Sequence, residues 1–340
     1  MDRSQRSPDA PVNGTPWTIV GQGLAGTCLA WDLWKRNVPF ILTDRGQGGS
    51  SRVAAGLINP VTGKNFEPSA DIEVFLPEAM AFYAEAERLL GETFWHPLPV
   101  LRLAADEKEW AKMLDKSTRP DVARWLSGNL HIEGWAGALE LSGGGRLDTR
   151  AFLDAARGFF LSHGIYQTQE IAIASATPHH IWCEGATGLI TGRYGAHRCA
   201  KGEILTLRAD TWDESHIRIG AGGWLVPLGD GLFKCGSTYE WNQLDETPTA
   251  QGMERIRTIA TRLGGDSFEI INHEAGIRPI LRRSEPLIGP LTDGGWMFNA
   301  LGSKGSLYAP GIARRLGAWL TDGTPPDAHY DFRNYQSPVP

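Results

Sequence analysis

The sequence predicts a two-domain α/β fold, in which a Rossmann-like domain with a parallel sheet is joined to a domain built on an antiparallel sheet. Its 340 residues are enough for two domains with substantial cores. A strand, a glycine-rich turn and a helix near the N-terminus indicate the first domain. Closely spaced short strands with turns between them, beginning at Gly202, indicate the second.

The N-terminal unit has the element order of a βαβ motif. An apolar run at 17–20 predicts a buried strand, and residues 24–36 predict a helix. A second parallel strand is expected at 40–42, ending at Asp44. Between the first strand and the helix, three glycines have the Gly-x-Gly-x-x-Gly spacing, namely Gly21, Gly23 and Gly26.

This unit predicts a dinucleotide site. Gly21 permits the tight turn, Gly23 lets the backbone approach a pyrophosphate, and Gly26 lets the helix pack closely on the strand. The helix N-terminus directs its N–H groups and the positive end of its dipole toward the phosphates. Asp44 is placed to accept hydrogen bonds from both ribose hydroxyls. The alternative is a glycine turn in an ordinary βαβ unit, with Asp44 as a solvated loop carboxylate.

The rest of the chain predicts alternating helices and strands. Residues 45–52 are rich in glycine and serine, and this loop either lies against a flat ligand or is a surface turn. Further along, Pro77 suits the first position of a helix. The helix after Asp106 is expected to bury Trp110, Met113 and Leu114. Helices are expected at 77–90, 106–115, 148–160, 250–263 and 309–320, and strands at 100–104, 130–135, 138–141, around Ile171, and at 180–183, 203–207, 224–228, 232–235 and 296–300.

Composition narrows the class of protein. The formal net charge of -6 gives no broad attraction to nucleic acid or anionic membranes, so neither is an expected partner. The four cysteines are scattered with no C-x-x-C, which indicates buried free thiols in a reducing, cytoplasmic compartment. No apolar stretch is long enough to span a bilayer. We expect residues 1–14 to be a disordered tail, and the proline-rich end after Thr324 to be a loose one.

Five landmarks in order then point to a family. They are the Gly21/Gly23/Gly26 to Asp44 unit, Ser50-Ser51-Arg52-Val53-Ala54-Ala55-Gly56, Cys183-Glu184-Gly185-Ala186, the hairpin from Trp224-Leu225-Val226-Pro227 to Gly236-Ser237-Thr238-Tyr239-Glu240, and Gly276-Ile277-Arg278-Pro279 with the terminal Gly302 to Pro310 segment. With these, the chain resembles the FAD-dependent oxidoreductases of the D-amino-acid oxidase and glycine oxidase type, from about Trp17 to Gly323.

The resemblance implies a discontinuous FAD-binding domain and a substrate domain whose sheet covers the flavin. The FAD-binding domain would comprise 15–80, 137–201 and 276–325, and the substrate domain 81–136 and 202–275. Relatives that hold FAD covalently use a cysteine after the Gly-x-Arg-Pro turn, and residues 280–283 contain none. FAD is therefore expected to be non-covalent. The resemblance implies cofactor contacts from Gly21, Gln22, Gly23, Leu24, Ala25, Gly26, Asp44, Arg45, Ser51, Arg52, Ala55, Ile171, Gly185, Arg278, Gly302, Ser303, Lys304, Gly305 and Ser306.

Three residues are implied at the catalytic end. Arg278 matches the family arginine that binds a substrate carboxylate, and a planar guanidinium suits bidentate pairing; alternatively it holds the Gly-x-Arg-Pro turn. Trp224 departs from the pattern, because amino-acid oxidising relatives often have a tyrosine hydroxyl near this position. Lys304 lies in the loop at the flavin edge, where it either pairs with an anion or is solvated.

The function implied is oxidation of a C–N bond in an amine or amino acid, with hydride transfer to flavin N5. The alternatives are oxidation of a hydroxy acid, oxidation of a modified tRNA base, as in the wobble-uridine enzymes of this family, and a non-catalytic nucleotide-binding protein with the same fold. The expected partner is a small-molecule substrate, and the sequence leaves the oligomeric state open.

Overall fold

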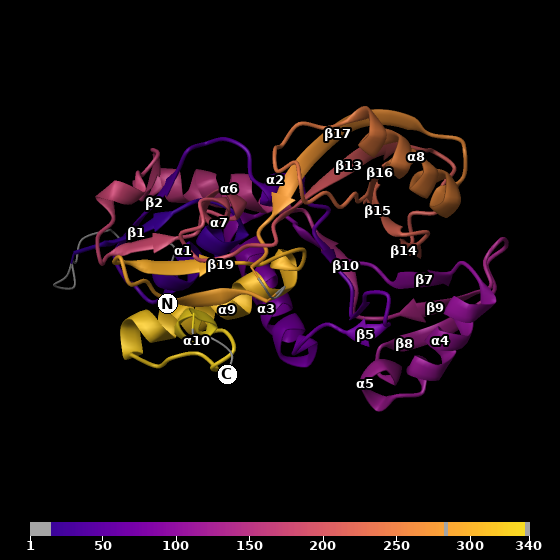
Figure 1. Cartoon of the computed structure of the whole chain (residues 1–340), viewed down its shortest axis with the longest axis horizontal. Coiled ribbons are helices and arrows are strands. Elements are labelled where there is room, and N and C mark those ends of the chain that lie inside the picture. Colours follow the sequence, from indigo (N-terminus) through magenta and orange to yellow (C-terminus); the bar gives the residue numbers. More distant parts are fainter. Residues whose placement is uncertain (1–14, 282–284, 337–340) are drawn as a thin grey trace.

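The computed structural model describes residues 15–281 and 285–336, and two large sheets dominate it (Figure 1). The expected tail at 1–14 lies outside the described residues. The first sheet has the order β11-β2-β1-β12-β19-β18 and is parallel except for the last pair. Its strands are β1 (Trp17–Val20), β2 (Phe40–Asp44), β11 (Tyr166–Thr168), β12 (His180–Trp182), β18 (Leu287–Pro290) and β19 (Trp296–Asn299).

Helices cover the first sheet and share its core. Ile19 in β1 and Leu42 in β2 are fully buried against side chains of α1, α3, α6 and α9. Near-continuous apolar strands are typical of a parallel sheet with helices on its faces. The helices of this part are α1 (Leu24–Lys35), α2 (Ser50–Val53), α3 (Ile72–Leu90), α6 (Thr149–Ser162), α7 (Ala186–Ile190), α9 (Gly305–Asp322) and α10 (Phe332–Gln336). Over the described residues, no helix is both long and apolar enough to cross a membrane.

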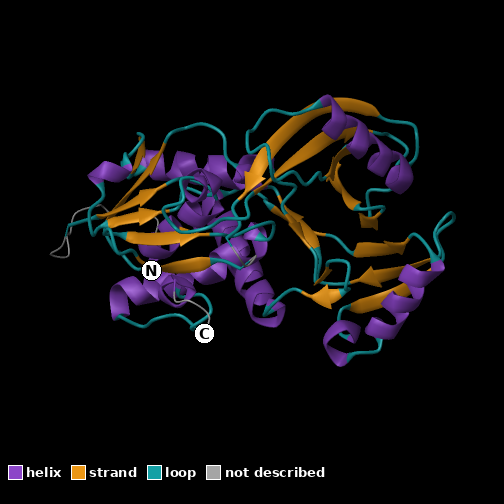
Figure 2. Ribbon diagram, in the orientation of Figure 1, coloured by secondary structure: helices purple, strands orange, loops and turns teal. Residues whose placement is uncertain are grey.

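The second sheet has eight strands in the order β17-β13-β16-β15-β14-β7-β9-β8, antiparallel except for β14 and β7. Helix α8 (Ala250–Gly264) packs on it through Ile256, Ile259 and Leu263, and Figure 2 shows the sheet as a curved layer beside the first domain. Its strands are β7 (Val100–Ala104), β8 (Leu126–Leu130), β9 (Gly137–Leu141), β13 (Ala200–Arg208), β14 (Ile217–Gly220), β15 (Gly223–Gly229), β16 (Leu232–Gly236) and β17 (Glu269–Arg278).

Short elements connect the two sheets. Strand β10 pairs with β3 and β6 in a small antiparallel sheet, and β4 pairs with β5 in a hairpin. Strand β9, which the boundary at residue 137 assigned to the first domain, pairs with β7 and β8 in the second sheet. The remaining short elements are β3 (Leu57–Ile58), β4 (Val61–Thr62), β5 (Glu67–Pro68), β6 (Trp95–Pro97), β10 (Gly145–Leu147), α4 (Glu107–Ser117), α5 (Pro120–Ala123) and the 3-10 turn η2 (Ile173–Ser175).

Two helices begin earlier than expected, each before an internal proline. Helix α3 begins at Ile72, five residues before Pro77, because Ile72 and Phe75 are buried in the first core. Helix α9 begins at Gly305, not residue 309, and contains Pro310. Pro310 has no N–H to donate to the carbonyl of Ser306, four residues before it. That carbonyl accepts a hydrogen bond from the Tyr83 hydroxyl at 2.8 Å instead. Tertiary contacts thus compensate for the missing backbone donor.

Several local expectations were wrong. Residues 50–53 of the expected loop form the short helix α2, and residues 131–136 form a turn after β8 instead of a strand. The strand expected around Ile171 is β11 at 166–168, since Tyr166 pairs with Leu42 at the sheet edge and the chain then leaves the sheet. Leu114 is exposed, whereas Met113 is buried.

The described part of the chain after Thr324, up to residue 336, is anchored to the first sheet, contrary to the expected loose end. Tyr330, Asp331 and Phe332 are buried, and the amide of Ile288 donates to the carbonyl of Tyr330 at 2.9 Å. Asp331 bridges to the same strand, β18. The prolines and polar residues of this segment indicated a loose end, although its few aromatic residues are buried and attach it to the sheet.

Candidate active site

Two adjoining cavities run from the N-terminal end of α1 to the inner wall of the eight-stranded sheet. The first has a volume of about 490 Å³ and contains Asp44 in its wall, and the second has a volume of about 530 Å³ and contains Arg278. They share wall residues, so they form one extended site. The shared residues are Gly23, Ser50, Ser51, Cys183 and Gly185.

The glycines of the N-terminal motif have different surroundings. A Cβ on Gly26 would lie 1.9 Å from the carbonyl oxygen of Gly21, and one on Gly21 would lie 2.5 Å from that of Cys183. Those two positions therefore require glycine for the strand–helix packing. A Cβ on Gly23 would meet only the Ser51 side chain, at 3.1 Å. Its missing side chain leaves room in the cavity, as a pyrophosphate on this helix N-terminus needs.

Asp44 lies at the end of β2 and orders the turn around it. Its carboxylate accepts hydrogen bonds from the amide of Gln22 at 2.7 Å and from that of Gly46 at 2.6 Å. Each carboxylate oxygen has a further lone pair available. The side chain is in the wall of the smaller cavity, where a ribose diol of an FAD molecule would meet it.

The loop after Asp44 joins the two cavities. The Ser51 hydroxyl accepts a hydrogen bond from the Leu24 amide at 3.2 Å, so this loop is attached to the start of α1. Arg52 forms an ion pair with Asp154 at 2.6 Å, and the Nε of Arg45 donates to the Gln47 carbonyl. Both arginines also line the smaller cavity. The loop is therefore held on the cavity by its own polar contacts.

The structure brings almost all of the sequence-predicted residues to this site. Gly26 alone lies outside both walls, where it packs on Gly21. The smaller cavity is lined by Gly21, Gln22, Gly23, Asp44, Arg45, Ser51, Arg52, Ile171 and Gly185, and the larger by Gly23, Leu24, Ala25, Ser51, Ala55, Gly185, Trp224, Arg278, Gly302, Ser303, Lys304, Gly305 and Ser306.

Arg278 lies at the end of β17 and is held by oxygen acceptors. Its guanidinium donates to the Ser237 hydroxyl at 2.6 Å and to the carbonyls of Thr238 and Lys201 at 3.1 and 3.3 Å. Burial lowers the pKa of this guanidinium. None of its contacts among the described residues is to a carboxylate, so its charge is left for a ligand. The indole of Trp224 lines the same wall.

Lys304 precedes the N-terminus of α9, at the opposite wall. Its ammonium donates to the Thr62 hydroxyl at 3.2 Å, and burial lowers its pKa. The first residues of α9 line the cavity and have no side-chain cap. The residues present thus fit FAD. At one end of the site, Gly23 leaves open space for the pyrophosphate and Asp44 can accept hydrogen bonds from the ribose. At the other end, the N-terminus of α9 is suited to negative charge.

Among the residues of the larger cavity that sequence reasoning missed, two bear on its chemistry. The ring of Tyr239 lies against the Arg278 guanidinium, with its centre 3.9 Å from the guanidinium carbon. Arg102 lines the same cavity from strand β7, which is five strands away from β17 in the sheet. The signal for Arg102 was present, because an arginine interrupts the apolar run Val100-Leu101-Arg102-Leu103-Ala104. Tyr239 lies within the recognised hairpin segment, but no local pattern distinguished it as a residue of the site.

Comparison with known proteins agrees with this geometry. A family model described as "FAD dependent oxidoreductase" matches residues 17–319. The glycine oxidase of Pseudomonas aeruginosa is 24% identical over 359 residues, covering 91% of this chain and 95% of that protein. The crystal structure of glycine oxidase from Geobacillus kaustophilus has a TM-score of 0.77 at 19% identity, covering 91% of this chain and 95% of that one.

A longer relative is similar over most of this chain. It is the tRNA 5-methylaminomethyl-2-thiouridine biosynthesis bifunctional protein MnmC of Marinobacter nauticus, 24% identical over 362 residues. The match covers 90% of this chain and 56% of the relative, so the chain spans little more than half of that protein's length.

The fold and the site define a two-domain flavoprotein oxidoreductase. The chain belongs to the DAO family of FAD-dependent oxidoreductases, and its cofactor is FAD, bound non-covalently.

Proposed function

We propose that this enzyme oxidises a C–N bond of an amine or amino acid whose carboxylate is bound by Arg278. The observation that carries the proposal is the state of Arg278, which is half-buried in the cavity wall and contacts hydroxyl and carbonyl oxygens but no described carboxylate. A buried cation without a counter-ion is unfavourable. A bidentate substrate carboxylate would supply the missing negative charge.

The chain's other residues supply position and electrostatics. FAD held at this site would supply the acceptor for the hydride that leaves the carbon beside the nitrogen. Among the described residues lining the larger cavity, none is an aspartate, glutamate or histidine, so no carboxylate or imidazole there would take a proton from the substrate amine, which would react in its neutral form. Trp224 gives the substrate an apolar wall, and the N-terminus of α9 stabilises negative charge at the opposite side. The imine product would hydrolyse in water.

The test is a screen of flavin bleaching under nitrogen. The holoenzyme would be mixed with amines, amino acids and hydroxy acids, each matched for chain length. The proposal expects loss of the visible absorbance of the oxidised flavin with an amine or amino acid, and no loss with the matched hydroxy acids. Bleaching by hydroxy acids alone would assign the enzyme to C–O oxidation.

A second candidate is the oxidation of a modified base in tRNA, which two observations favour. The similarity to MnmC covers 90% of this chain. In addition, Trp241 is 58% exposed and its ring centre lies 6.0 Å from that of Tyr239, beside the cavity. An exposed aromatic pair is a surface on which an unstacked base can stack. Bleaching by hypomodified tRNA, lost in Trp241→Ala but not in Trp212→Phe, would support this candidate over a free amino acid.

A further inference from the structure

A second arginine, Arg102, faces the larger cavity from strand β7, five strands away from β17 in the eight-stranded sheet. In β7, Leu101 and Leu103 pack in the core beneath α8, so the intervening Arg102 points to the other face of the strand. Its cross-strand neighbours are Ile219 and Leu139, which are both apolar. Arg102 therefore places a charge in an apolar row at the cavity wall.

The Arg102 guanidinium has few partners. One terminal nitrogen donates to the Gly63 carbonyl over a long 3.4 Å, and the guanidinium carbon lies 5.6 Å from the centre of the Phe66 ring. The buried Nε has no hydrogen-bond partner among the described residues. Burial lowers the pKa of the group, and Glu109 opposes this only through space, without forming an ion pair. Buried polar groups of this kind are normally satisfied.

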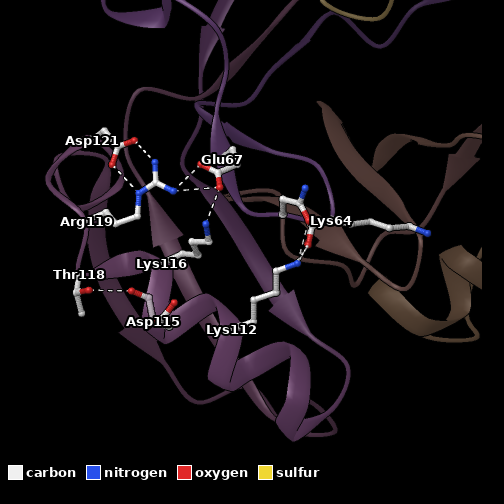
Figure 3. Close-up of polar contacts among 9 residues, drawn as sticks. Lys64, Glu67, Lys112, Asp115, Lys116, Thr118, Arg119 and Asp121 are labelled. Carbon is white, nitrogen blue, oxygen red and sulfur yellow. Dashed lines mark hydrogen bonds and ion pairs between the residues drawn. The ribbon is translucent and has the colours of Figure 1, made fainter.

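The segment that Arg102 contacts is tied to helix α4 and the residues after it by polar contacts. Figure 3 shows Glu67, in β5, joined to Lys116 and Arg119, and Lys112 reaching back to the turn before β5. The Lys112 ammonium donates to the Lys64 carbonyl at 2.7 Å. These surface cations have close acceptors, whereas Arg102 has only the long hydrogen bond to Gly63, and its Nε has no partner among the described residues.

The charges of the cavity are unbalanced. Arg102, Arg278 and Lys304 all line it, and none of its described wall residues is acidic. Lys304 and Arg102 contact the consecutive residues Thr62 and Gly63, so they face the cavity from one wall, while Arg278 faces it from another. One substrate carboxylate at Arg278 would leave Arg102 without a counter-ion.

We propose that the substrate carries a second carboxylate, distant from the first, and that Arg102 binds it. This inference rests on the proposed function, because it assigns one carboxylate to Arg278. Strands β7 and β17 are five steps apart in the sheet, or about 24 Å along its surface, and the curvature of the sheet brings both arginines to one cavity. The two acidic groups must therefore be separated by several bonds, as in an N-(carboxyalkyl) amino acid.

The test measures binding as well as oxidation. The holoenzyme would be titrated, under nitrogen, with N-(carboxyalkyl)glycines of increasing chain length and with the same compounds whose distal carboxylate is a primary amide. Shifts of the flavin spectrum give each Kd. At the preferred length, the wild type should bind the dicarboxylate about 10- to 100-fold more tightly than the amide, as expected for hydrogen bonds to a charged group.

Variants then assign the preference to a residue. Arg102→Met should remove the preference for the dicarboxylate and leave the Kd of the amide unchanged, and Arg102→Lys should restore part of it. Arg218→Met is the matched control, because Arg218 lies in the neighbouring strand β14 and binds the Leu263 carbonyl outside the cavity. Equal weakening of both ligands in Arg102→Met, or no preference at any length in the wild type, would overturn the inference.

The two proposals fail in different ways. If the dicarboxylates bind through Arg102 but no amine reduces the flavin, the distal site stands and the proposed C–N oxidation falls. If amines reduce the flavin but the distal carboxylate adds no affinity, the oxidation stands and the distal site falls.

Discussion

The guanidinium carbon of Arg278 lies 3.9 Å from the centre of the Tyr239 ring, in a cation–π contact at the wall of the larger cavity. Arg278 has no described carboxylate partner, so the ring and three oxygen acceptors are what hold it. Tyr239 is thus a positioning residue for the group that we assign to the substrate carboxylate. It is also 43% exposed, which places the ring between the cavity and solvent.

A first prediction separates the ring of Tyr239 from its hydroxyl. Tyr239→Leu removes the cation–π contact, worth about 0.5–2 kcal/mol, and should weaken carboxylate binding by that amount. Tyr239→Phe retains the ring and should bind carboxylates as the wild type does. The measurement is the Kd of acetate from flavin spectral titration. A loss in Phe as large as that in Leu would assign the role to the hydroxyl instead.

A second prediction concerns the space at Gly23. Gly23→Val should yield a folded but colourless protein, because the new side chain has room only in the cavity that the pyrophosphate needs. Gly158→Val is the matched control, since a Cβ at that helical position meets nothing within 4 Å. Flavin content after purification and circular dichroism would be compared. Full flavin content in Gly23→Val would remove the cofactor from this helix N-terminus.

The Asp44 carboxylate provides a third prediction. Asp44→Ala should weaken FAD binding by about 1.5–3 kcal/mol, the range for hydrogen bonds to a charged acceptor. Asp44→Asn keeps an oxygen that can accept from the Gln22 amide and should lose less. The Kd of FAD would be measured by fluorescence on the flavin-free protein. Identical Kd values for the wild type and the two variants would mean that Asp44 is a solvated loop carboxylate that does not bind the ribose.

A fourth prediction is a pH dependence from Lys304. Burial lowers the pKa of this ammonium, so it loses its charge at a lower pH than an exposed lysine does. If that charge attracts anions, acetate affinity should decrease as the pH rises through the lowered pKa. Lys304→Met should bind acetate more weakly at neutral pH and lack this decrease. An unchanged pH profile in Lys304→Met would show that the ammonium faces away from the anion.

The sequence was sufficient for the parts of the fold whose signals are local. The Gly21–Asp44 unit predicted β1, α1 and β2, because its glycine spacing and its apolar strands both indicate a βαβ unit. The expected cofactor residues, which the family resemblance implied, line the two cavities, with the exception of Gly26. Pro77 misled the prediction, because it was interpreted as a helix start although burial of Phe75 extends the helix before it. The last helix also begins before its expected start at residue 309, and the Tyr83–Ser306 hydrogen bond compensates for Pro310 within it.

The remaining differences depend on contacts between distant segments. The C-terminal segment has little local pattern, and the burial of Phe332 against β18 fixes it. Arg102 and Arg278 are 176 positions apart in the chain, and only the curvature of the sheet brings both to one cavity. No pattern within either strand contains that information.

The most direct test of the account compares Arg278→Lys with the wild type on two matched substrates, an amino acid and the amine that lacks its carboxylate. Lysine keeps the charge but loses the planar fork. We predict that kcat/KM on the amino acid falls about tenfold or more, with an intact flavin spectrum and little change on the amine. Equal losses on both substrates would show that Arg278 is structural and would contradict the proposed binding of the carboxylate.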